Sequence, residues 1–156
     1  MAPPNKLVPY KKSVAGSLLA AREAIMAPIR PLLREANVTE QQWRVLRVLS
    51  DEGPLGIAEL AEEAMLHGPS VTRILKELVD RKLVVRKLDK TDRRRSIVAI
   101  TTEGQDVIDH TAAFTLVLIN NYVSAFGRER LQTLLSELAA FSEVLAEFAP
   151  SEGKGE

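Results

Sequence analysis

Apolar residues recur at helical spacing along most of the chain. Over residues 13–36 they are Val14, Leu18, Ile25, Met26, Ile29 and Leu33. Pro28 and Pro31 fall inside this pattern, and a proline removes a backbone donor and clashes with the preceding helical turn. The pattern therefore predicts a helix over 13–36 that is kinked or split near the two prolines.

A capping-box pattern marks the start of the next helix. Thr39 is followed three residues later by Gln42, so each side chain can bind the backbone N–H of the other residue. Gly53-Pro54 predicts the end of this helix. A short helix is then predicted from apolar residues at i, i+3, i+4 and i+7, namely Ile57, Leu60, Ala61 and Ala64.

The spacing of apolar residues changes from helical to strand-like at Leu83. Before it, residues 67–70 (HGPS) predict a turn and a helix start, with Pro69 suited to the first helical position. After it, two β-branched runs, 83–88 and 95–101, flank a polar loop and predict a β-hairpin.

Two long helices follow the hairpin. Thr102 with Gln105 predicts another capping box, and Gly127 separates the helix after it from a last helix. Two helices joined by a tight turn and followed by a hairpin describe a winged helix-turn-helix. The expected fold class is mainly α with a small β-hairpin wing, a winged helix-turn-helix plus a helical dimerisation domain.

This order of elements predicts the domain organisation. We expect a flexible arm over 1–12, an N-terminal dimerisation helix over 13–36, a winged helix-turn-helix DNA-binding domain over 37–101, C-terminal dimerisation helices over 102–149 and a disordered tail over 150–156.

Composition argues against several kinds of chemistry. The chain has no cysteine, which excludes disulfides, thiolate catalysis and cysteine-ligated zinc, and it has only two histidines, His67 and His110. It shows no nucleophile elbow, glycine-rich phosphate loop or metal-ligand cluster, so we expect neither an enzyme nor a cofactor. It has no apolar run of about 20 residues and no signal-peptide pattern, so we expect a cytoplasmic protein without a membrane span.

Charge is segregated along a chain whose formal net charge is zero. Residues 1–72 carry eight basic and eight acidic residues, 73–101 carry ten and four, and 102–156 carry three and nine. The net charges of the last two segments are therefore +6 and −6. A basic segment in an otherwise neutral or acidic chain is typical of an anion-binding surface, although a solvated charged face is equally consistent with charge alone.

The hairpin loop concentrates this positive charge in residues 89–96 (DKTDRRRS). Arginines at a hairpin tip suit the narrow, electronegative minor groove of DNA, and Asp92 could orient one of them by a charge-assisted hydrogen bond. On the preceding helix we expect Arg73 to contact a guanine, while Ser70 and Thr72 can bind bases or phosphates, or Ser70 can cap the helix. The candidate DNA-binding residues are Ser70, Thr72, Arg73, Lys76, Arg86, Lys90, Asp92, Arg93, Arg94 and Arg95.

The run LVVRKLDKTDRRRSIVAITTEGQ, residues 83–105, resembles the wing signature of the MarR family of bacterial transcription regulators, with its D-x-R tip and T-x-x-G helix entry. The resemblance covers residues 13–148, and residues 18–49 look like regulators of homoprotocatechuate and related aromatic-acid catabolic operons. It implies a homodimer that binds a pseudo-palindromic operator in double-stranded DNA, usually as a repressor released by a small aromatic effector. It places Asp92 and Arg94 at the family's wing positions and 68–76 at the start of the recognition helix.

The same resemblance implies an effector cavity between the dimerisation helices and the winged domain. Its candidate residues are Ser17, Arg22, Met26, Trp43, Arg44, Arg47, His110 and Phe114. Arg22 could clamp a carboxylate and Trp43 could supply an aromatic wall. Alternatively, Arg22 pairs with a nearby or partner-chain acid, Trp43 belongs to the core, and His110 is a surface or core histidine. The implied effector is a phenolic or aromatic carboxylate, or its thioester.

Two alternatives to a repressor remain open from the sequence. A winged domain can bind protein rather than DNA, and salt-dependent binding to duplex DNA distinguishes the two. The chain could also activate transcription, because repression or activation depends on where the operator lies relative to the promoter.

Overall fold

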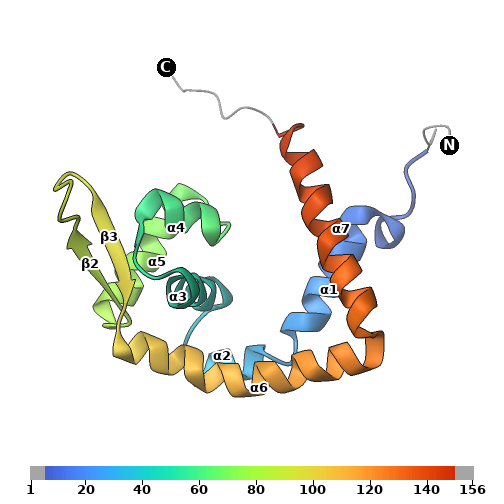
Figure 1. The fold of residues 1–156 in the computed structure, drawn as a ribbon, viewed down its shortest axis with the longest axis horizontal. Coiled ribbons are helices and arrows are strands. Elements are labelled where there is room, and N and C mark those ends of the chain that lie inside the picture. Colours follow the sequence, from blue (N-terminus) through green and yellow to red (C-terminus); the bar gives the residue numbers. More distant parts are fainter. Residues whose placement is uncertain (1–5, 150–156) are drawn as a thin grey trace. The chain divides into compact units, whose positions relative to one another are not determined.

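The computed structural model describes residues 6–149, so the start of the predicted arm and the predicted tail over 150–156 lie outside the described residues. The chain forms two compact units, residues 1–113 and 114–156. In order, the elements are η1 (Tyr10–Lys12), α1 (Val14–Met26), α2 (Arg30–Glu35), α3 (Glu40–Glu52), β1 (Leu55–Gly56), α4 (Ile57–Glu63), α5 (Gly68–Asp80), β2 (Val84–Leu88), β3 (Ser96–Ile100), α6 (Thr102–Phe126) and α7 (Arg128–Ala146) (Figure 1). The mainly helical fold class with a hairpin wing is confirmed. The dimerisation roles in the predicted domain division stay predictions.

The predicted break near the prolines is confirmed. The Ser13 hydroxyl caps α1 by accepting from the backbone N–H of Gly16 at 3.0 Å, and this helix ends at Met26. The next helix, α2, starts at Arg30 with Pro31 in its first turn, where the missing N–H of a proline costs little.

The predicted capping box at the start of α3 is also confirmed. The Thr39 hydroxyl accepts from the Gln42 backbone N–H, and the Gln42 side-chain oxygen accepts from the Thr39 backbone N–H, both at 3.1 Å. At the other end the helix stops at Gly53, whose φ of 81° lies in the left-handed region that glycine adopts without strain.

The predicted hairpin is present, within a sheet that contains one more strand. In the hairpin, β2 and β3 pair antiparallel from Val84↔Ile100 to Leu88↔Ser96. The two-residue strand β1 adds to the other edge of β3, which gives the order β1-β3-β2. The sequence pattern did not indicate β1, because two residues are too few to display an alternating period.

The predicted capping box of Thr102 with Gln105 is wrong, because the capping residue is Thr101. The Thr101 hydroxyl accepts from the backbone N–H of Gly104 at 3.0 Å and donates to the Lys82 carbonyl at 2.7 Å. Thr102 already belongs to α6. The side chain of Gln105 instead binds Ser50 and Asp109.

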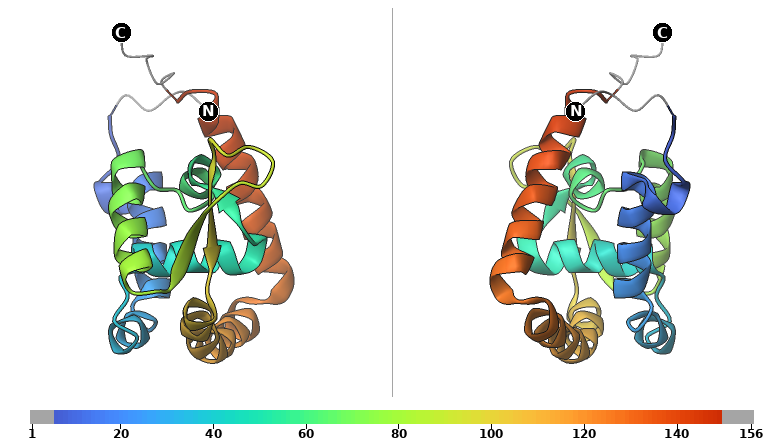
Figure 2. Two further views of the ribbon diagram at one scale, coloured as in Figure 1. Left: turned by 90° about the vertical axis from the view of Figure 1, so that its left-hand side faces the viewer. Right: turned by 90° about the vertical axis from the view of Figure 1, so that its right-hand side faces the viewer.

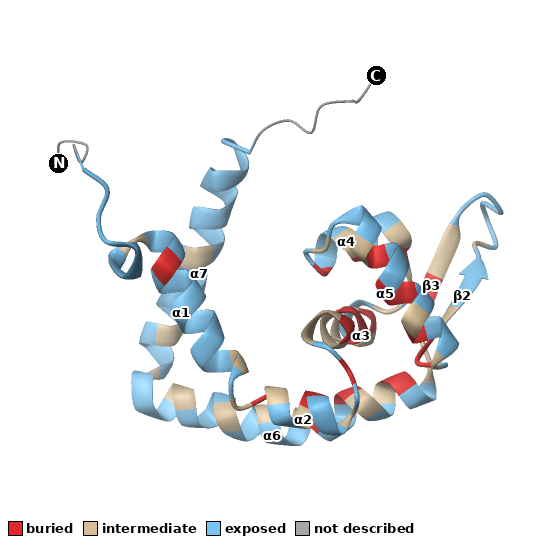
Figure 3. Ribbon diagram, turned by 180° about the vertical axis from the view of Figure 1, so that it is seen from behind, coloured by how far each residue is buried: buried red, intermediate tan, exposed pale blue. Residues whose placement is uncertain are grey.

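The core of the first unit joins α3, α4 and α5 to the sheet. Buried residues concentrate on these three helices and on the strands β2 and β3 (Figure 3). They include Leu46, Leu49, Leu60, Ile74, Leu78, Val84 and Val98, each 1 % exposed or less. Burying such side chains supplies most of the stability of a small unit, so the core holds α5 rigidly against the rest of the winged domain.

The second unit exposes apolar side chains. None of the residues of α7, all of which the structure describes, is buried. Within residues 6–149, no helix has both the length and the apolar character needed to cross a bilayer.

Candidate nucleic-acid interface

Helices α4 and α5 form the helix-turn-helix, with residues 64–67 between them. The apolar stripe of α5 is buried, which directs the side chains of Thr72, Arg73 and Lys76 to solvent. The N-cap residue of α5 is His67, and its side chain makes no capping hydrogen bond. Ser70 lies half-buried inside the first turn, so it does not cap the helix as the sequence allowed. In helix-turn-helix proteins the exposed face near the start of the second helix enters the major groove, so this polar face of α5 is the candidate surface for base contacts.

The exposed polar face of α5 adjoins the first strand of the wing. Helix α5 packs against β2 (Figure 2). A cavity of about 300 Å³ between them is lined by Thr72, Lys76 and Arg86, among others. The structure thus brings together three of the predicted DNA-binding residues from two elements.

The wing tip is shaped by two acidic side chains. The Asp89 carboxylate accepts from the backbone N–H of Thr91 at 2.9 Å and from its hydroxyl at 2.8 Å, and these bonds lower the pKa of Asp89. Asp92 accepts from the backbone N–H of Arg94 at 3.0 Å, whereas the sequence suggested that it could hold an arginine side chain. The acids beside the arginines therefore order the backbone of the turn.

The three consecutive arginines differ in their surroundings. The Arg95 guanidinium donates to the Glu59 carboxylate of α4. The side chains of Arg93 and Arg94 have no ion-pair partner among residues 6–149 and are exposed, as is that of Lys90. Arg93, Arg94 and Lys90 are therefore available to an anion, while Arg95 ties the wing to the helix-turn-helix.

Glu59 joins this contact to the sheet. Its carboxylate accepts from the Gly56 backbone N–H at 3.1 Å as well as from Arg95. These two bonds, the backbone bond first, hold the pKa of Glu59 below its ordinary value. A Cβ at Gly56 would lie 2.7 Å from the Arg95 guanidinium, so glycine leaves room for this contact.

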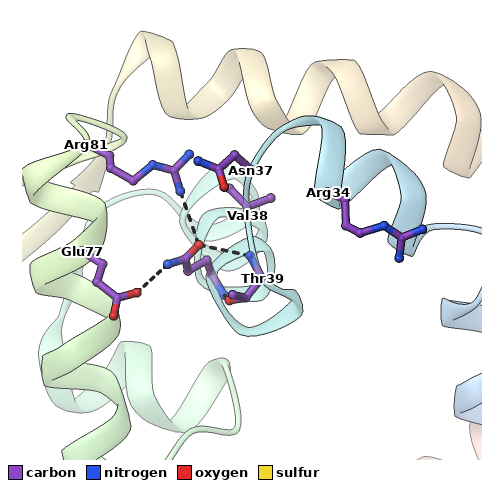
Figure 4. A pocket seen from close by; sticks show the side chains of 7 residues that line it. Arg34, Asn37, Val38, Thr39, Glu77 and Arg81 are labelled. Carbon is purple, nitrogen blue, oxygen red and sulfur yellow. Dashed lines mark hydrogen bonds between the residues drawn. The ribbon is translucent and has the colours of Figure 1, made fainter.

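A second cavity, of about 400 Å³, lies where the turn between α2 and α3 meets the end of α5. It is lined by Arg34, Asn37, Val38, Thr39, Gln42, Glu77 and Arg81, of which Arg34 points away from Arg81 (Figure 4). Arg81 donates to the Ala36 carbonyl at 3.4 Å and to the Gln42 side-chain oxygen at 3.5 Å.

Gln42 and Glu77 were not among the residues predicted for the site. Glu77 stands four residues after Arg73, the spacing of a helical ion pair, and this was the available signal. The contact between Gln42 and Glu77 joins residues 35 apart, which no local pattern indicates.

Four of the predicted effector residues already have partners. Arg22 pairs with Glu23 at 3.3 Å and Glu40 at 2.6 Å, and Arg47 pairs with Asp51 at 3.1 Å. The remaining two partnered residues bind uncharged groups. Trp43 donates its ring N–H to the Thr111 hydroxyl at 3.1 Å, and Arg44 donates to the carbonyls of Ala64 and Met65 at the end of α4.

The other four effector candidates have less confined surroundings. Ser17, His110 and Phe114 are exposed, and Met26 is half-buried. Within residues 6–149, no group of three or more histidine, aspartate or glutamate side chains is placed to hold a metal ion.

Comparison with known proteins agrees with this geometry. The model of the MarR family matches residues 36–95, the segment that contains the helix-turn-helix and most of the wing. The transcriptional regulator FarR of Neisseria gonorrhoeae is 37 % identical, over 85 % of this chain and 93 % of the relative. The homoprotocatechuate degradative operon repressor of Escherichia coli is 33 % identical, over 83 % of this chain and 87 % of the relative.

A solved structure extends the likeness beyond the winged domain. NadR, crystallised in complex with 4-hydroxyphenylacetate, is 33 % identical to this chain with a TM-score of 0.79, over 92 % of this chain and 99 % of NadR. FarR is named a transcriptional regulator, and the Escherichia coli relative is named an operon repressor. With its helix-turn-helix, its hairpin wing and these relatives, the chain belongs to the MarR family of transcriptional regulators.

Proposed function

We propose that this regulator is a homodimeric repressor of an aromatic-acid catabolic operon, released from a pseudo-palindromic operator by a phenolic or aromatic carboxylate or its thioester. The observation that carries DNA binding is a set of exposed cationic side chains on the helix-turn-helix and the wing. Arg73 lies on α5, Lys76 and Arg86 line one cavity between α5 and β2, and Arg93 and Arg94 lie at the wing tip. Helix α5 supplies base contacts in the major groove, and the wing reaches the adjacent minor groove.

The aromatic ligand class is supported by two of the relatives. One is named a repressor of homoprotocatechuate degradation, and NadR was crystallised with 4-hydroxyphenylacetate. Both are about one-third identical to this chain over most of its length. Trp43 supplies an aromatic surface for such a ligand. Arg47 supplies a guanidinium whose ion-pair partner among residues 6–149 is an exposed aspartate, Asp51. Arg22 would have to release Glu40 before it could bind a ligand carboxylate.

A second copy of the chain accounts for the exposed apolar surfaces. In α7, Leu134, Leu135, Phe141 and Leu145 are 37–58 % exposed, and α1 exposes Val14, Leu18 and Ile25. Apolar area of this kind in a protein that must stay in water is covered by association. A dimer also places two recognition helices in successive major grooves about 34 Å apart. A ligand that binds better to a dimer with another spacing releases the DNA.

The test is fluorescence anisotropy with the full chain and a duplex that it selects from a randomised library. The titration is repeated with 4-hydroxyphenylacetate, homoprotocatechuate, hydroxycinnamates, benzoates and their thioesters. We expect one compound to weaken binding to this duplex at least tenfold, which corresponds to about 1.4 kcal/mol of coupling. Non-aromatic carboxylates of similar size serve as controls. Unchanged binding with every compound would rule out release by this ligand class.

A further inference from the structure

Three side chains link the start of α3 to the recognition helix. Gln42, 5 % exposed, donates its side-chain N–H to the Glu77 carboxylate at 2.7 Å. The other oxygen of Glu77 accepts from the Arg73 guanidinium at 3.1 Å. Arg73 is the residue for which we expect a base contact. The buried amide of Gln42 on α3 is therefore connected through Glu77 to a base-contacting side chain on α5.

The capping box fixes which end of the Gln42 amide faces α5. A backbone N–H can only donate, so the Thr39 N–H must bind the amide oxygen, as it does at 3.1 Å. The amide NH₂ is then directed to Glu77, where it meets a carboxylate oxygen (Figure 4). The Arg81 guanidinium at 3.5 Å, on the same amide oxygen, favours the same orientation.

The hydrogen bond from Gln42 to Glu77 changes the energetics of the ion pair between Arg73 and Glu77. The side chains of Arg73 and Glu77 are 65 % and 41 % exposed, and such pairs are weak because both side chains must be ordered. Here Gln42 orders the carboxylate beforehand, so only Arg73 loses freedom. One guanidinium nitrogen of Arg73 donates to Glu77. Its other N–H donors have no partner among residues 6–149, so they can reach the two acceptors of a guanine.

We propose that Glu77, held by Gln42, is a positioning residue that sets the orientation of Arg73 for base reading. The inference rests on the proposed function of Arg73. Glu77 does not touch DNA in this role, and its positioning of Arg73 acts on sequence discrimination. Loss of its negative charge should by itself strengthen binding to any duplex, because phosphates repel a carboxylate.

The experiment compares dissociation constants of the full chain for its selected duplex and for a scrambled duplex of equal length. A bidentate arginine–guanine contact is worth roughly 5- to 150-fold in discrimination. We expect Glu77→Gln to lower the ratio of scrambled to selected constants by about five- to tenfold, a part of that range. The loss of discrimination should be confined to the base pair that Arg73 distinguishes, as mapped with Arg73→Ala. In the Arg73→Ala variant, adding Glu77→Gln should cause no further loss of discrimination.

Gln42→Glu gives a second, independent variant. Glutamate serves a capping box as well as glutamine does, so α3 keeps its start. Its carboxylate would face that of Glu77, which should swing away from Arg73 and lower discrimination as Glu77→Gln does. The matched control is Glu63→Gln, which removes the same charge from an exposed position on α4, outside this chain of bonds and outside the cavity between α5 and β2. We expect it to strengthen binding to both duplexes alike and to leave the ratio unchanged.

The outcomes separate the inference from the function on which it rests. If Arg73→Ala leaves discrimination unchanged, the base-reading role of Arg73 is wrong and this inference is overturned with it. If Arg73→Ala lowers discrimination while Glu77→Gln and Gln42→Glu leave it unchanged or raise it, only the positioning role is overturned. Thermal unfolding monitored by circular dichroism shows that each variant is folded at the assay temperature.

Discussion

At the wing tip, acidic side chains order the backbone that carries the cationic side chains. The carboxylates of Asp89 and Asp92 accept from backbone N–H groups of the turn, and their charge therefore fixes the loop. Of the three arginines that follow, Arg95 forms an ion pair with Glu59 of α4, whereas Arg93 and Arg94 remain exposed at the tip. The sequence identified this loop correctly as a hairpin, but the different roles of its arginines depend on Glu59, which is 36 residues away.

Gly104 is the glycine of the T-x-x-G helix entry, and the structure gives it a packing role. A Cβ at this position would lie 2.1 Å from the Leu83 carbonyl oxygen, which belongs to the backbone and cannot turn aside. We expect Gly104→Ala to lower the free energy of unfolding by about 1–3 kcal/mol, the usual cost of overpacking. Urea unfolding followed by circular dichroism measures the change.

Gly68→Ala is the matched control for this substitution, because nothing lies within 4 Å of a Cβ at Gly68 and the residue is also in a helix. We expect little change, or a small gain from the higher helix propensity of alanine. Equal stability of the two variants would contradict the close approach of α6 to Leu83.

At the scale of elements, an ionic cluster joins the three helices at the start of the chain. Glu40 on α3 accepts from Arg22 of α1 at 2.6 Å and from Arg30 of α2 at 2.5 Å, and Arg30 also pairs with Glu23 at 2.7 Å. The bond from Arg30, followed by that from Arg22, lowers the pKa of Glu40 below its ordinary value of 4.5. The carboxylate also lies in the first turn of α3, where the helix dipole favours negative charge.

The cluster makes stability depend on pH in a defined direction. Since the pKa of Glu40 is lower in the folded chain, its contribution is complete above its ordinary value of 4.5 and is lost as the pH falls through the folded value. We expect Glu40→Gln to reduce the free energy of unfolding by about 1–2 kcal/mol at pH 7, and the difference from the wild type to shrink below pH 4.5.

Urea unfolding of both proteins across this pH range provides the measurement. Glu35→Gln is the control, because Glu35 is an exposed glutamate of α2 outside the cluster. A loss for Glu40→Gln that is as large below pH 4 as at pH 7 would show that its charge is not the cause.

The elements themselves were largely predictable from local patterns. Helical spacing, the prolines at 28 and 31 and the capping box at Thr39 indicated the first helices, and the change of period at Leu83 indicated the hairpin. The second capping box was placed one residue late because Thr101 and Thr102 offer the same hydroxyl, and only the nearby Lys82 carbonyl distinguishes them. The chain of Gln42, Glu77 and Arg73 could not be predicted as a whole, because its first contact forms only after α3 and α5 pack.

At the scale of the whole molecule, the segregation of charge along the chain follows the boundaries of its elements. The basic segment 73–101 coincides with most of α5 and the entire wing, while the acidic segment 102–156 coincides with α6 and α7. A net positive charge concentrated in the recognition elements directs the phosphates of a duplex to that part of the protein. Of the exposed apolar residues for which we propose a second copy as partner, those of α7 lie in the acidic segment, and the others lie on α1.

The most direct test is the salt dependence of binding to the selected duplex, for the wild type and Arg94→Ala, with the scrambled duplex beside it. A dimer that makes about 6–10 phosphate contacts should lose roughly 10³–10⁵ in affinity between 50 and 200 mM salt. We expect this steep fall together with a clear preference for the selected duplex. Arg94→Ala should weaken binding and lower the salt slope by about 1 for each phosphate that Arg94 neutralises in the wild type. Binding that is weak, insensitive to salt and equal for both duplexes would contradict the account, and the winged domain would then be a surface for protein.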